Sequence, residues 1–255
     1  MTSPLKVWFD AEGRLLRLRL SQPKANLIDA AMIAALDTAL AEHLENASIG
    51  AVLLDAEGPH FSFGASVEEH LPGQCGPMLR NLHRLVLRLV EAPVPVLAAV
   101  QGRCLGGGLE VALASHMIFV SPDASLAQPE MNLGVFAPAA SCLLPELVGP
   151  GRAFDLLLSG RAITGAEAVA IGLAHEAASD PEAAALAYFD RYLKPKSTSS
   201  LRLAVKAARF DHCARVRAKI DFVERLYLDE LMETHDAVEG LNAFIGKREA
   251  QWQHR

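Results

Sequence analysis

The chain has 255 residues, of which 51% are hydrophobic and 21% are charged, and its formal net charge is −6 at pH 7. This length suffices for one large domain or for one domain with a helical appendage, and the acidic balance disfavours nucleic-acid binding, which usually needs a basic face. No apolar run reaches the roughly 18 residues of a membrane span, and the first residues lack the pattern of a signal peptide. We therefore expect a cytoplasmic protein without membrane or nucleic-acid contacts.

The cysteines argue against a disulfide framework and against a metal site, because they are widely spaced and form no CxxC pair. They are Cys75, Cys104, Cys142 and Cys213.

Hydrophobic periodicity predicts the first elements of the chain. Apolar and polar residues alternate over Lys6–Leu20, which predicts two half-buried strands that turn at Glu12-Gly13. An apolar stripe predicts a helix over Ala30–Leu44, and Asp29 is placed to cap it. A short buried strand is expected over Ala51–Leu54, and a second amphipathic helix over Gly76–Val90.

The stretch Val94–Ser115 combines an apolar strand, a turn with glycines at 106, 107 and 108, and the start of a helix that carries Glu110. Such a turn can point backbone N–H groups at negative charge. It lacks the GK[ST] of a P-loop, the last glycine of a dinucleotide fingerprint and the GxSxG of a nucleophile elbow. From the residues alone, an ordinary tight turn and an oxyanion-binding turn both remain open.

Later segments predict a strand over Met117–Val120 and helices over Arg152–Ser159 and Thr164–Ala170. From Pro181 to Arg255 the pattern is almost wholly helical, with a break at Lys194-Pro195. Helices between short apolar strands favour an α/β fold with a largely parallel sheet. We expect a core over residues 1–193 and a helical C-terminal region over residues 194–255.

Two backbone N–H groups and two acids form the candidate site. The small residues of the loop FSFGAS let its backbone approach a ligand, so the N–H groups of Ala65 and Gly107 are candidates for an oxyanion hole. Glu110 and Glu130 each stand among apolar neighbours, which raises carboxyl pKa values and suits acid–base catalysis near neutral pH. Taken singly, an acid in such a segment is more often structural than catalytic.

Other polar residues carry no recognisable chemistry. Ser66 and Ser141 have no activating partner in the sequence, and three histidines are interpreted as surface or core-edge residues. These are His70, His116 and His235.

Four segments together resemble the crotonase (enoyl-CoA hydratase/isomerase) superfamily over about Lys6–Arg255. They are PKANLID, FSFGASVEE, VQGRCLGGGLEVALAS and AQPEMNLG. The resemblance implies a spiral of ββα turns, a helical C-terminal trimerisation region, a homotrimer or homohexamer, and an acyl-CoA thioester substrate. Because CoA is part of that substrate, no separate cofactor is expected.

The resemblance also implies residue roles. The oxyanion-hole donors correspond to Ala65 and Gly107, and the two hydratase glutamates to Glu110 and Glu130. Further residues are similar to positions that bind substrate: Ala25, Leu27, Ser66, Val67, Glu68, Phe136 and Lys247.

The presence of both glutamates favours addition of water to an unsaturated thioester. The stretches FGASVEEHLPGQC and LGVFAPAASCLLP depart from ordinary hydratases and resemble the branch of the family that hydrates cyclohexa-1,5-diene-1-carbonyl-CoA. In that reading Phe136 and the residues after it shape a flat ring pocket. The alternatives are a general short-chain enoyl-CoA hydratase and, from another class, a non-catalytic relative that binds acyl-CoA or RNA.

Overall fold

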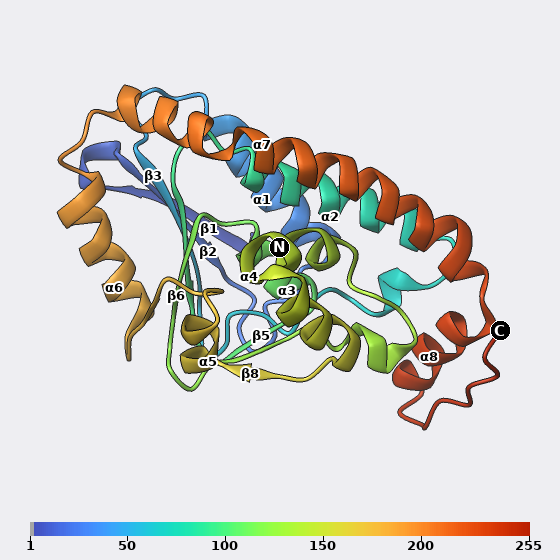
Figure 1. Ribbon diagram of the computed structural model, residues 1–255. Coiled ribbons are helices and arrows are strands. Elements are labelled where there is room, and N and C mark those ends of the chain that lie inside the picture. Colours follow the sequence, from blue (N-terminus) through green and yellow to red (C-terminus); the bar gives the residue numbers. More distant parts are fainter. Residues whose placement is uncertain (1–2) are drawn as a thin grey trace.

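A six-stranded sheet is the centre of the computed structural model, which describes residues 3–255 (Figure 1). The first two strands are antiparallel and every later neighbour is parallel, so the predicted parallel α/β architecture is confirmed. The strand order is β1 (Leu5–Asp10), β2 (Leu15–Leu20), β3 (Ala51–Ala56), β4 (Val96–Val100), β6 (Met117–Val120) and β9 (Glu176–Ala177).

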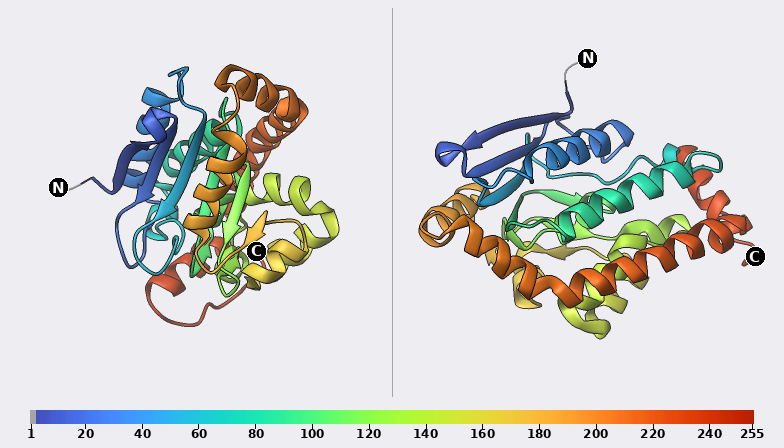
Figure 2. Two further views of the ribbon diagram at one scale, coloured as in Figure 1. Left: turned by 90° about the vertical axis from the view of Figure 1, so that its left-hand side faces the viewer. Right: turned by 90° about the horizontal axis from the view of Figure 1, so that it is seen from above.

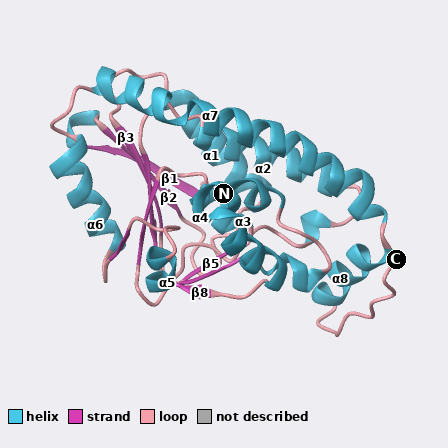
Figure 3. Cartoon of the chain, in the orientation of Figure 1, coloured by secondary structure: helices cyan, strands magenta, loops and turns pink. Residues whose placement is uncertain are grey.

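Helices cover both faces of this sheet (Figure 3). On one face, leucines such as Leu16 and Leu18 pack toward α1 (Ala30–His43) and α2 (Cys75–Val90) in the main core. The alternate residues of the same strands, among them Leu53, pack on the other face with α6 (Pro181–Tyr188). The side chain of Asp29 accepts a hydrogen bond from the Met32 amide at 2.9 Å, which confirms the predicted cap of α1.

A second, three-stranded sheet carries the glycine turn. Its order is β5 (Arg103–Leu105), β7 (Ser125–Ala127) and β8 (Ile163–Thr164). The expectation of one strand leading directly into the glycines was wrong, because β4 ends at Val100 and the chain crosses to β5 before α3 (Gly107–Leu113) begins. Strands of two or three residues are too short for alternation to reveal them.

The segment after the second acid is one kinked helix, α4 (Pro138–Ser159). The sequence suggested a helix only from Arg152, because Pro145 and Pro150 break the pattern. Gly149 has a non-helical backbone and marks the kink. The short helix predicted over Thr164–Ala170 is confirmed as α5 (Gly165–Ala170), and the side chain of Thr164 caps its first turn.

The C-terminal region contains the long helix α7 (Thr198–Arg225) and the shorter α8 (His235–Ile245). Figure 2 shows α7 running the length of the molecule toward α8, near the C-terminus. The helical region is confirmed, but its predicted extent to Arg255 was wrong, since residues 247–255 are not helical. None of the helices within residues 3–255 is long and apolar enough to cross a membrane. The boundary at residue 193 stays a prediction.

Candidate active site

Two loops place the predicted oxyanion donors side by side. Ser62 and β5 run parallel, with the Ser62 amide bonded to the Arg103 carbonyl and the Leu105 amide to the Ser62 carbonyl, both at 3.0 Å. A Cβ atom added to Gly107 would lie 3.2 Å from the Ala65 nitrogen, so the backbones are in close contact. Within residues 3–255, neither the Ala65 nor the Gly107 N–H has a hydrogen-bond acceptor. Both donors are therefore free for a ligand oxygen.

Glu130 lies against this turn. It belongs to a 3-10 helix over Pro129–Leu133, and its Oε1 atom would be 2.6 Å from a Cβ atom on Gly106. The buried Gln128 amide, oriented as donor, places its nitrogen 3.2 Å from both carboxylate oxygens. Burial of the carboxyl and the charge of Glu110 raise the pKa of Glu130 to about 8. Glu130 is therefore largely protonated at neutral pH.

Glu110 is the more buried of the two acids, with 3% of its surface exposed. Its Oε1 accepts a hydrogen bond at 2.9 Å from the amide of Ala140, in the first turn of α4. Burial raises the pKa of Glu110, whereas this hydrogen bond and the positive charge of His83 oppose the rise. The two acids thus sit in different environments, and such pairs can divide the roles of proton donor and proton acceptor.

One cavity of about 520 Å³ joins these groups. Its lining includes Ala65, Gly107 and both glutamates, and α2 contributes Leu79 and Leu82 as an apolar wall. Leu241 and Phe244 close it from α8, so the C-terminal region forms part of the site. A thioester oxygen at the N–H groups would lie in the same space as the two carboxyl groups.

The remaining predicted substrate-binding residues divide into two groups. Val67 and Phe136 line the cavity. The others lie outside its lining, so their predicted role along a CoA path stays a prediction: Ala25, Leu27, Ser66, Glu68 and Lys247.

Sequence reasoning missed several polar residues of the site, among them His70 and Gln128. His70 does lie at the edge of the core, as predicted, but it also lines the cavity, which the sequence did not indicate; it ends the 3-10 helix Glu68–His70. Gln128 contacts Glu130, and its only signal was a polar residue beside an acid in an apolar segment. His116 does lie at the edge of the core, as predicted.

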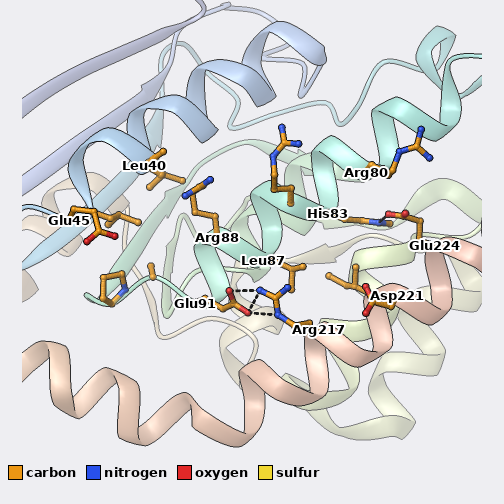
Figure 4. Close-up of a pocket in the computed structure, with 16 residues that line it drawn as sticks. Leu40, Glu45, Arg80, His83, Leu87, Arg88, Glu91, Arg217, Asp221 and Glu224 are labelled. Atoms are coloured by element: carbon orange, nitrogen blue, oxygen red, sulfur yellow. Dashed lines mark hydrogen bonds and ion pairs between the residues drawn. The ribbon is translucent and has the colours of Figure 1, made fainter.

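A second cavity, of about 530 Å³, is a polar groove between α1, α2 and α7 (Figure 4). Its charged groups largely neutralise one another: Arg217 pairs with Glu91, and His83 Nδ1 lies 2.7 Å from Glu224. This groove lacks the free N–H donors and the buried acids of the first cavity. Within residues 3–255, no cluster of three or more potential ligands could hold a metal ion.

Comparison with known proteins gives concordant results. The family model described as enoyl-CoA hydratase/isomerase matches residues 10–255. A Thauera aromatica protein named cyclohexa-1,5-dienecarbonyl-CoA hydratase is 61% identical, over 100% of this chain and 98% of the relative. A Bacillus subtilis protein named probable enoyl-CoA hydratase is 32% identical, over 92% of this chain and 94% of the relative.

Solved structures show the same fold. An enoyl-CoA hydratase from Mycobacterium avium subsp. paratuberculosis superposes with a TM-score of 0.86 at 22% identity, covering 99% of this chain and 100% of the other. An enoyl-CoA hydratase/isomerase from Pseudoalteromonas atlantica gives a TM-score of 0.85 at 26% identity, covering 98% and 99%. The predicted crotonase-type fold is confirmed, and the chain belongs to the enoyl-CoA hydratase/isomerase family.

Proposed function

We propose that this protein adds water to cyclohexa-1,5-diene-1-carbonyl-CoA and forms 6-hydroxycyclohex-1-ene-1-carbonyl-CoA, in the anaerobic breakdown of aromatic compounds. The observation that carries the proposal is the pair of buried carboxyl groups, Glu110 and Glu130, beside two unpaired backbone N–H groups in one cavity. The Thauera aromatica relative at 61% identity supports the choice of this acyl group.

The N–H groups of Ala65 and Gly107 would stabilise the reaction by binding the thioester oxygen. As water adds, electron density moves from the diene toward this oxygen, and an enolate-like charge develops on it. Donors that are already in place need no reorganisation at that moment. Loss of one such donor typically costs about 3 kcal/mol in the barrier.

The two carboxyl groups would move the protons. The ionised one removes a proton from water while the water oxygen bonds to the β-carbon of the thioester. The remaining electrons shift along the conjugated diene, and the protonated carboxyl delivers its proton to the far end of that diene. One double bond stays conjugated with the thioester. The hydroxyl group from the water and the proton from the carboxyl group together amount to one water molecule added to the diene. The raised pKa of Glu130 fits the role of proton donor.

A general short-chain enoyl-CoA hydratase is the second candidate, and it is favoured by relatives such as the Bacillus subtilis protein. Turnover of crotonyl-CoA and of the cyclic dienoyl-CoA by the purified protein separates the two functions. A clear preference for crotonyl-CoA would reject the cyclic substrate.

The mechanism is tested with Glu110→Gln and Glu130→Gln. Each variant keeps the shape of the side chain but cannot exchange a proton, so we expect the fold to persist and kcat to fall by at least about 100-fold. Glu42→Gln, an exposed acid on α1, is the matched control. Unchanged turnover in either site variant would remove that acid from the mechanism.

The acyl-CoA substrate class follows from the family, and the finer assignments remain part of the proposal. We propose a homotrimer or homohexamer in the cytoplasm, with CoA entering as part of the substrate and no separate cofactor. Exposed apolar side chains on α7, including Leu203 and Phe210, support self-association.

A further inference from the structure

His70 is a polar side chain in the active-site cavity for which the proposed mechanism has no use. It ends the 3-10 helix Glu68–His70, which follows directly on the loop that holds Ala65. His70 lines the same cavity as Glu110, Glu130 and Phe136. A polar group in this position can contact the acyl part of a thioester held at the N–H groups.

A hydrogen bond to the backbone of Ser66 determines which ring nitrogen of His70 carries the proton. Nδ1 lies 2.7 Å from the carbonyl oxygen of Ser66. A carbonyl only accepts, so Nδ1 must carry the proton and donate it. Burial lowers the pKa of His70, which keeps the ring neutral at physiological pH. In a neutral ring with a protonated Nδ1, the other nitrogen, Nε2, has a free lone pair.

Within residues 3–255, Nε2 has no hydrogen-bond partner, and it is the ring nitrogen left for the cavity. A lone pair is a pure acceptor, so its ligand must bring a donor. An unsaturated hydrocarbon ring or chain has none, whereas the hydrated acyl group has a hydroxyl. On the α2 side of the cavity, the side chains of Leu79 and Leu82 are apolar and offer no hydrogen bond to a ligand hydroxyl.

We propose that Nε2 of His70 accepts a hydrogen bond from the hydroxyl group of the acyl moiety, so that His70 selects hydroxylated acyl thioesters over unsubstituted ones. This inference rests on the proposed function, because it assumes that an acyl thioester occupies the cavity. It adds a specificity-determining residue to the two acids and the two N–H donors. It also gives the segment after the oxyanion loop a role in holding the hydrated acyl group.

The test uses thioesters that cannot lose or gain water. Benzoyl-CoA is compared with 2-, 3- and 4-hydroxybenzoyl-CoA by titration calorimetry on the full-length protein. We expect at least one hydroxylated ring to bind about three- to tenfold more tightly than benzoyl-CoA, the range of a net hydrogen bond. Equal affinity for all four thioesters in the unmodified protein would overturn the proposal.

Two substitutions separate a ligand contact from a structural role. His70→Gln retains an acceptor near the position of Nε2 and loses the anchor to Ser66, whereas His70→Asn retains a donor near Nδ1 and loses the acceptor in the cavity. We expect Gln to preserve most of the preference for the hydroxylated ring and Asn to abolish it, with benzoyl-CoA affinity within about twofold in both. The reverse order would mean that only the anchor matters. His43→Asn, at the end of α1 and outside the cavity, is the control.

A result that rejects the cyclic substrate can be distinguished from a result that rejects the role of His70. If no aromatic thioester binds, the ring-shaped substrate is rejected, and the same variants are compared with butyryl-CoA and 2-hydroxybutyryl-CoA, whose hydroxyl group is not at the β-carbon from which a hydratase eliminates water. Loss of the hydroxyl preference in His70→Asn with the linear pair would support the role of His70 on its own. No preference within the linear pair in the unmodified protein would refute it.

Discussion

Gly106 provides the sharpest test of the site geometry, because it lies in the glycine turn and directly contacts the carboxyl group of Glu130. Its φ angle is +47°, and a Cβ atom there would lie 2.6 Å from Glu130 Oε1. That is about 0.8 Å short of an ordinary van der Waals contact of 3.4 Å. In Gly106→Ala either the carboxyl group or the turn must move by this amount.

A displacement of this size has a predictable cost. Misplacing a reacting group by about 1 Å lowers the rate by about 100-fold, so we expect kcat of Gly106→Ala to fall by roughly 30- to 100-fold. The backbone conformation adds a strain of about 1–3 kcal/mol, which lowers the melting temperature. Steady-state hydration of the cyclic dienoyl-CoA measures the first effect and thermal unfolding the second.

Gly172→Ala is the matched control. Gly172 has φ of +80°, but a Cβ atom there meets nothing within 4 Å. This variant should therefore lose stability through backbone strain while its kcat stays within about twofold. If Gly106→Ala also retained normal kcat, the inferred contact between the turn and Glu130 would be refuted. If both variants lost activity equally, the loss would reflect stability alone.

Two further predictions concern proton affinity. The alkaline limb of the kcat/KM–pH profile, which reports the free enzyme, should lie near pH 8, where Glu130 loses its proton. It should move to lower pH in Glu110→Gln, because the charge of Glu110 raises the pKa of Glu130. A limb that stays in place would contradict the coupling of the acids. In His83→Gln the acid limb should move to higher pH, since the charge of His83 lowers the pKa of Glu110; identical profiles in the two proteins would exclude this influence.

The stability of the protein should also respond to the Glu130 carboxyl. Folding raises its pKa from 4.5 to about 8, so the folded state binds more protons than the unfolded state between these pH values. This contribution is fully present below pH 4.5 and is lost as pH rises through about 8.

The helices α1 and α2 could be predicted because buried apolar residues recur along them at helical spacing. Predicted and observed ends of α1 and α2 agree within one residue, since each helix has one apolar face packed in the main core. The tail over residues 247–255 shows the opposite case. Trp252 lies beside Gly134 and Gly240, and Glu239 and Asp236 accept hydrogen bonds from the tail's backbone. These tertiary contacts override a composition that suggested a helix.

The acids and the glycine turn stood out in the sequence because a charged residue or a run of glycines is unusual in an apolar segment. His70 did not, because its function depends on which way a single 3-10 turn points its ring. No local pattern encodes that direction. The same applies to Gln128, whose importance comes from its contact with Glu130. Residues that act through orientation thus need the structure, whereas residues that act through an unusual residue type can be found without it.

The three consecutive glycines illustrate how one sequence motif combines separate physical demands. A side chain at Gly106 would collide with the Glu130 carboxyl, and one at Gly107 would press on Ala65. A Cβ atom at Gly108 would lie 2.4 Å from the Cβ of Ser62, on the strand-like segment that leads into the oxyanion loop. Each glycine therefore keeps a different part of the site in contact with the turn. The motif contains three glycines in succession because Glu130, Ala65 and Ser62 each approach a different one of them closely.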